Sequence, residues 1–110
     1  MVEYNPDIDS VFRALGDPTR LRMIERLSQG PHTVGELAEP LNMTLAGASK
    51  HVGVLETAGL LVREKRGRVR VCTLRTGRLE AARDWIRRYS AFWNERLDAL
   101  DHAIREEGDE

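Results

Sequence analysis

The stretch "TLAGASKHVGVLETAGLL", residues 44–61, has the apolar spacing of a helix but carries Gly47 and Gly53 in its interior. A glycine in a helix interior costs about 1 kcal/mol relative to alanine. On a helical wheel one side of the segment is apolar and is expected to face a core: Leu45, Ala48, Val52 and Leu55. The two glycines raise the question of what approaches the other side.

That other side is small, lightly polar and singly basic. It carries Ala46, Lys50, Gly53 and Thr57, with Gly47 beside them and Ser49 and His51 on the flanks. A helix surface that faces solvent is normally filled with long charged residues. Small residues let a large body come close, and the major groove of DNA admits a helix in this way. The alternative is that a neighbouring protein helix needs the same clearance.

Two helices are predicted ahead of this stretch. Residues 7–15 form a stripe at helical spacing that ends at Gly16. Asp17 is then a good N-cap, and Pro18 suits the first turn of the next helix. Its buried stripe is expected to be Leu21, Ile24 and Leu27. Gly30 and Pro31 should end this second helix.

Capping residues in the sequence also indicate a short third helix and the start of the helix after it. Thr33 and Glu36 have the spacing of a capping box, which predicts a helix that Pro40 should cut or kink. Thr44 is the predicted N-cap of the helix in residues 44–58.

The periodicity changes after this helix. Residues 61–66 and 69–74 alternate, with Arg66-Gly67 at the reversal, so they predict a β-hairpin with a basic tip. From Thr76 to about residue 107, apolar residues recur every three or four positions, which predicts one helix of roughly 30 residues and about 45 Å in length.

This order of elements contains a helix-turn-helix followed by a wing. The predicted fold is mainly α with a small β-hairpin: a winged helix-turn-helix with a long C-terminal dimerisation helix. Its 110 residues suggest a single domain over 1–110. The helix-turn-helix is expected at about 33–58, the wing at about 61–74 and the dimerisation helix at about 76–106.

The net charge of −1 hides an uneven distribution. Residues 63–88 contain ten basic and three acidic side chains. Such a zone predicts either a face that meets a polyanion or a solvated arginine-rich surface. Cations crowd the hairpin tip, at Lys65, Arg66, Arg68 and Arg70, and suit phosphate contacts or insertion into a minor groove. The alternative is a charged edge strand that resists aggregation.

Residues 8–75 resemble the ArsR-type (arsenic repressor) winged helix-turn-helix regulators. The resemblance rests on "VFRALGDPTRLRMIERL", "VGELAEPLNMTLAGASKHVGVLETAGLL" and "REKRGRVRVCTL", and is most specific in "ASKHVGVLETAGLL". It implies a homodimeric bacterial or archaeal transcription factor, usually a repressor, which an effector releases from operator DNA. Residues 44–58 would be the recognition helix. The predicted DNA-binding residues are Thr44, Ala46, Gly47, Ser49, Lys50, His51, Gly53, Lys65, Arg66, Arg68 and Arg70.

The predicted partners are double-stranded operator DNA and a second copy of the chain. The family's first and last helices form its dimer interface, and the last helix here holds four of the six aromatic residues. So wide an apolar surface usually marks an interface. The expected interface residues are Ile8, Phe12, Trp85, Tyr89, Phe92, Trp93, Leu97 and Leu100. The same aromatics could instead line a pocket for an apolar effector.

The metal-sensing motifs of the family are missing. Thr33-Val34-Gly35 stands where arsenic sensors have Cys-x-Cys, and Asp84 is followed by Trp85-Ile86 rather than by the histidine of zinc sensors. Asp98, Asp101 and His102 could bind zinc across a dimer, but charges at a helix end in solvent are the favoured account. We therefore predict no metal and no cofactor.

The remaining features limit the function classes. Cys72 is the only cysteine, so it is either a strand cysteine or a redox switch whose pKa the hairpin cations lower. No signal-peptide core or membrane span is present in the sequence, and a cytoplasmic location is expected. No catalytic constellation is found, so an enzyme is not expected. The alternatives to a DNA-binding repressor are a protein-docking winged helix, or a metal- or thiol-responsive form of the repressor.

Overall fold

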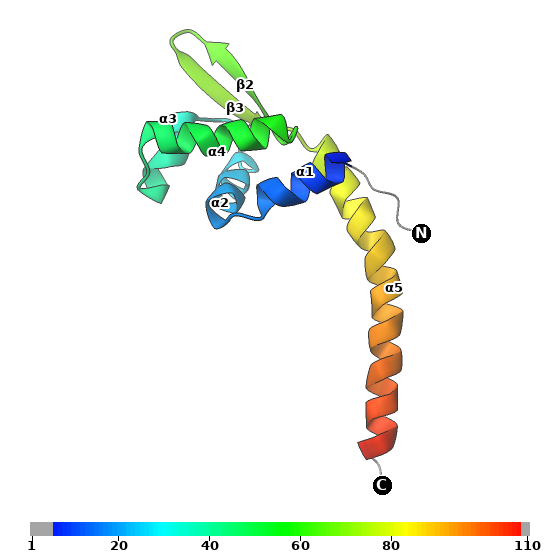
Figure 1. Cartoon of the computed structure of the whole chain (residues 1–110). Coiled ribbons are helices and arrows are strands. Elements are labelled where there is room, and N and C mark those ends of the chain that lie inside the picture. The colour runs from blue at the N-terminus through cyan, green and yellow to red at the C-terminus, as the bar shows by residue number, and fades with distance from the viewer. Residues whose placement is uncertain (1–5, 109–110) are drawn as a thin grey trace.

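The structure is a computed structural model that describes residues 6–108, apart from the side chains of Pro6, Trp93 and residues 106–108. Figure 1 shows a small helical body with a hairpin on one side and a long helix that leaves it. The elements are α1 (Pro6–Leu15), α2 (Pro18–Leu27), β1 (His32–Thr33), α3 (Val34–Ala38), the 3-10 helix η1 (Glu39–Leu41), α4 (Leu45–Thr57), β2 (Leu61–Arg66), β3 (Val69–Leu74) and α5 (Gly77–Gly108).

The predicted helix caps are confirmed. Asp17 accepts hydrogen bonds from the backbone N–H groups of Thr19 and Arg20. Thr33 and Glu36 form the reciprocal capping box, and Pro40 converts the end of α3 into η1. The backbone N–H of Arg20 is the main cause that lowers the pKa of Asp17, and the backbone N–H of Thr33 does the same for Glu36. Both caps therefore stabilise the fold above the ordinary carboxylate pKa and weaken as the pH falls below it.

The core lies between α1, α2, α3, α4 and the base of the hairpin. Its most buried side chains are Val11, Met23, Leu37, Val52, Leu55, Leu60 and Cys72. Two residues expected in the core lie outside it. Leu21 is 43% exposed because Met23, not Leu21, turns inward from α2. Leu45 is 64% exposed because it is the first residue of α4, where the Cα–Cβ bond points beyond the helix N-terminus.

The hairpin is confirmed at residues 61–66 and 69–74, and it gains a third strand. Gly67 has a φ of 64° at the first position of the two-residue turn, a conformation that a side chain would strain. β1 pairs with β3, with His32 opposite Cys72, so the strand order is β1-β3-β2. His32 therefore lies in a strand and is half-buried, and its Nδ1 lies 2.7 Å from the Gly30 carbonyl oxygen. β1 could not be predicted from the sequence, because a strand of two residues is too short to show alternation of apolar and polar side chains.

The corner between α4 and β2 depends on Gly59. The N–H groups of Gly59 and Leu60 donate to the carbonyls of Glu56 and Leu55, the hydrogen-bond pattern of a Schellman motif. Gly59 has a φ of 77°, and Arg78 of α5 packs directly over it. Arg78 also donates to the Ala58 carbonyl and pairs with Asp7, at 3.3 and 3.4 Å. This arginine thus joins the end of α4 to α1 and α5.

α5 begins on the body and then extends away from it (Figure 1). At the junction Phe12 of α1 makes an edge contact with Trp85, with ring centroids 5.5 Å apart, and Trp85 lies 4.5 Å from Tyr89. These three predicted interface residues therefore pack within one chain. Farther along α5, large apolar side chains are exposed: Ile86, Phe92, Leu97, Leu100 and Ile104.

Gly59→Ala should lower the free energy of unfolding by about 1–2 kcal/mol, the cost of a left-handed conformation with a side chain. The new Cβ would also come within 2.6 Å of Arg78 Nε. Urea denaturation at a fixed protein concentration measures the change. Gly77→Ala is the matched control, because nothing lies within 4 Å of its Cβ, and it should change stability by less than about 0.5 kcal/mol. Equal losses would show that the corner does not depend on Gly59.

Candidate nucleic-acid interface

The predicted contact residues divide between α4 and the hairpin tip. The N-cap Thr44 and the α4 residues Ala46 and Lys50 are exposed, whereas Gly47, Ser49, His51 and Gly53 are half-buried. The four wing cations, Lys65, Arg66, Arg68 and Arg70, are all exposed. Arg66 lies 3.7 Å from Glu64, and no ion pair within residues 6–108 engages the other three. The wing therefore offers three cations that are available to an external anion.

Gly47 and Gly53 of α4 differ in how closely they are packed. Gly47 donates its N–H to Thr44 Oγ1 at 3.1 Å, and a Cβ on Gly47 would lie only 3.2 Å from that oxygen. Gly53 lies beside the wing, where a Cβ would come within 3.7 Å of Arg63 Nη2. That distance is an ordinary van der Waals contact, so Arg63 does not by itself require a glycine at residue 53. The clearance expected from the sequence stays a prediction, which the small exposed residue Ala46 also favours.

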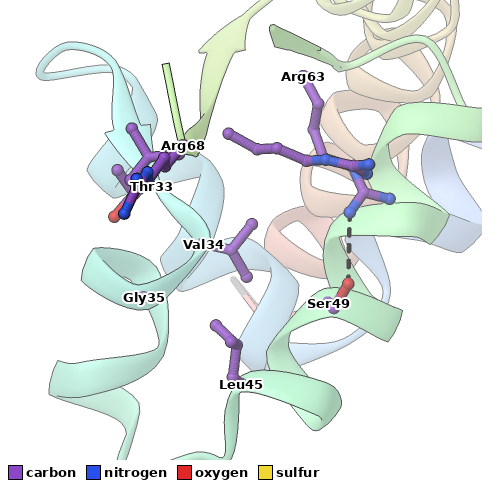
Figure 2. Close-up of a pocket in the computed structure, with 9 residues that line it drawn as sticks. Thr33, Val34, Gly35, Leu45, Ser49, Arg63 and Arg68 are labelled. Carbon is purple, nitrogen blue, oxygen red and sulfur yellow. Dashed lines mark hydrogen bonds between the residues drawn. The ribbon is translucent and has the colours of Figure 1, made fainter. Parts of the chain in front are cut away.

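Arg63 of β2, which was not among the predicted contact residues, joins the wing to α4. Its Nη1 donates to Ser49 Oγ at 3.3 Å, as Figure 2 shows. Its Nε and Nη2 both reach Glu56 Oε1, at 3.4 and 3.2 Å. Strand alternation could have indicated this role, since residues two apart share a face and Arg63 therefore lies on the same face as buried Leu61.

Arg20 of α2 is a second arginine outside the predicted contact residues, and it positions His51. Its Nε donates to the Ala14 carbonyl at 2.6 Å, and its Nη1 lies 3.2 Å from His51 Nδ1. Arginine can only donate, so Nδ1 must accept. In the neutral imidazole the proton then sits on Nε2, which makes Nε2 the nitrogen that can donate to an outside group. No spacing in the sequence indicates a contact over 31 residues.

A pocket of about 460 Å³ separates the N-terminal half of α4 from the wing. It is lined by Thr33, Val34, Gly35, Leu45, Ser49, Arg63, Arg68, Val69 and Arg70. Figure 2 shows Val34 and Leu45 between the two helices and the arginines above them. Cations from the wing and apolar groups from α3 and α4 therefore meet in one hollow.

Cys72 does not have the surroundings of a redox switch. Its side chain is fully buried in β3, and this burial raises the pKa of the thiol. Arg63 acts in the opposite direction but is the smaller influence. Of the two alternatives, the redox switch with a lowered pKa is therefore wrong and the strand cysteine is confirmed. Burial favours the uncharged thiol, which is the less reactive form.

The C-terminal cluster of possible metal ligands is exposed. Asp101 pairs with Arg105 at 3.2 Å on the surface of α5. Across the described part of the chain, no group of three or more His, Cys, Asp or Glu residues is arranged to hold a metal ion. Within the same part, no helix is both long and apolar enough to span a membrane.

A short helix, a turn, a second helix with a small-residue outer face and a basic hairpin define the winged helix-turn-helix class. Residues 15–64 match the model of a helix-turn-helix domain family. The HTH-type transcriptional regulator Rv2034 of Mycobacterium tuberculosis is 38% identical over 102 residues, which cover 93% of this chain and 92% of that protein. The transcriptional repressor SdpR of Bacillus subtilis is 29% identical, covering 72% and 88% respectively.

A crystal structure of an ArsR family transcriptional regulator superposes with a TM-score of 0.77 and 38% identity, covering 86% of this chain and 97% of that one. The chain belongs to the ArsR family of winged helix-turn-helix transcriptional regulators. It is accordingly a DNA-binding regulator.

Arg63→Ala should lower the free energy of unfolding by about 1–2 kcal/mol, because hydrogen bonds to a charged group are lost from a partly buried site. Thermal or urea unfolding measures this change. Arg66→Ala removes an exposed pair in the same strand and should change stability by less than about 0.5 kcal/mol. If Arg63→Ala is as mild as Arg66→Ala, the contact does not hold the wing.

Proposed function

We propose that the chain is a homodimeric repressor that binds a palindromic operator, with α4 in the major groove and the wing on the flanking backbone. The observation that carries this proposal is the hydrogen bond from Arg63 to Ser49, which holds the basic wing beside the small-residue face of α4. One DNA duplex could then meet both. The name of the relative SdpR supports repression rather than activation.

The proposal assigns sequence preference to α4. Side chains in the N-terminal half of a recognition helix contact base edges in the major groove. Lys50 is exposed there and could bond a guanine or a phosphate. His51 could donate from Nε2 to a phosphate, because Arg20 occupies its Nδ1. Ser49 accepts a hydrogen bond from Arg63, and its hydroxyl proton remains to be donated to DNA.

The proposal assigns non-specific affinity to the wing. Lys65, Arg68 and Arg70 have no acidic partner within the described residues, so neutralising phosphates does not break an ion pair. Each such contact releases counterions and makes binding weaken as salt rises. An arginine at the tip could also enter a narrow minor groove.

The proposed dimer explains the apolar surface of α5. Leu97 and Leu100 are 58% and 57% exposed, and Ile86 and Ile104 continue the same stripe. A monomer seldom leaves so long an apolar stripe on a helix that projects from its body. Two copies paired through this surface would present two α4 helices to successive major grooves, which matches half-sites about one helical turn apart. Trp93 belongs to the predicted interface but its side chain lies outside the described residues.

The test of DNA binding is fluorescence anisotropy on duplex from the gene's own upstream region, against scrambled duplex, over a range of salt concentrations with and without chelator. Replacing both Arg66 and Arg68 with alanine should weaken binding to every duplex. It should also reduce the slope of log K against log salt by about 0.9 per lost phosphate contact. Lys50→Ala should instead reduce the preference for the upstream duplex.

Arg105→Ala, a cation near the far end of α5, is the control and should keep both the slope and the preference. Binding that is equally weak on both duplexes, and unaffected by the wing variants, would contradict the proposal and favour a protein-docking role.

The test of the dimer is sedimentation of the variant with Leu97→Glu and Leu100→Glu. Burying a leucine contributes about 1.5–3 kcal/mol, and each change removes that leucine from both copies, so each change should raise the dimer dissociation constant by about two to four powers of ten. Ala91→Glu, exposed on the opposite side of the helical wheel, should leave the mass unchanged. A dimer that survives the leucine changes would place the interface elsewhere.

A further inference from the structure

Leu45 is unusual for a residue at the start of the recognition helix. It is the first residue of α4, and it is the most exposed of the large apolar side chains in the described structure, at 64%. An isolated exposed leucine needs no special explanation. Leu45 is not isolated, however, because Val34 of α3 and Val69 of β3 line the same pocket. Three elements thus bring apolar groups to one point on the proposed DNA face.

Charge identifies what this pocket faces. Arg68 and Arg70 line it together with the apolar groups and no carboxylate does, while Arg63, which also lines it, is paired with Glu56 of α4. A protein segment that covered Leu45 and Val69 would have to present anions as well as apolar surface. A DNA strand does so by its chemistry, since its phosphates suit the arginines and its bases supply the surface next to them.

Only one base offers an apolar group in the major groove. Thymine carries a C5-methyl there, whereas the other three bases show donors and acceptors. We propose that Leu45 contacts the methyl group of a thymine in each operator half-site and thereby determines the base at that position. This inference rests on the proposed function, because it places α4 in the major groove.

The neighbouring contacts favour this role for Leu45. Ser49 lies one turn further along α4 and is tied to Arg63, so its side chain is less free to adapt to a base. Leu45 makes no such bond, and Figure 2 shows its side chain directed into the pocket toward Val34. Base choice next to the wing therefore falls to an apolar contact.

The experiment begins with duplexes that wild-type protein selects from a random pool. Each thymine of the selected sequence is then replaced by deoxyuridine, which removes the methyl group and keeps every hydrogen-bonding group. Anisotropy is measured for wild type and for Leu45→Ala. At one thymine per half-site, deoxyuridine should weaken wild-type binding about four-fold, the effect of one buried carbon. The same replacement should have no effect on Leu45→Ala.

Leu21→Ala is the matched control, because it truncates another exposed leucine outside the pocket and should keep the full response to deoxyuridine. If wild type binds the selected duplex but no thymine responds, the inference is overturned and the proposed function stands. The inference also fails if Leu45→Ala retains the deoxyuridine response. If wild type selects no sequence and binds no duplex, the proposed function itself fails.

Discussion

The hydrogen-bonded ion pair that Arg63 makes with α4 is the contact on which the rest of the interface depends. One guanidinium bonds Ser49 near the start of the recognition helix and Glu56 near its end. It therefore fixes the angle between helix and hairpin at two points. The caps and the core make α4 a stable helix, but among the described residues only this arginine ties the direction of the wing to it by hydrogen bonds at both ends.

The sequence predicted the local structure well because local chemistry determines it. The caps at Asp17, Thr33 and Thr44 and the turn at Gly67 need only nearby residues, and each lies where it was expected. The prediction that Leu45 faces the core was wrong because a helical wheel does not take account of where a helix ends. Leu45 is the first residue of α4, where the core no longer covers the apolar side of the helix.

The candidate site was predictable in composition but not in its contacts. Its outer residues and cations follow from periodicity and charge. The bonds of Arg20 to His51 and of Arg63 to Ser49 join residues 31 and 14 positions apart. They depend on tertiary packing, which periodicity does not describe. Gly53 shows the same limit, since its neighbour is Arg63 of another element.

Arg78 has a mechanical consequence. It joins the first turn of α5 to the end of α4 and to Asp7 of α1. α5 has 32 residues and is about 48 Å long. A tilt of about 5° at this joint moves its far end by about 4 Å. A small rotation at the Arg78 contact with α4 therefore becomes a large displacement at the far end of α5. A partner that binds this far end would fix the orientation of α5 relative to α4 with little force.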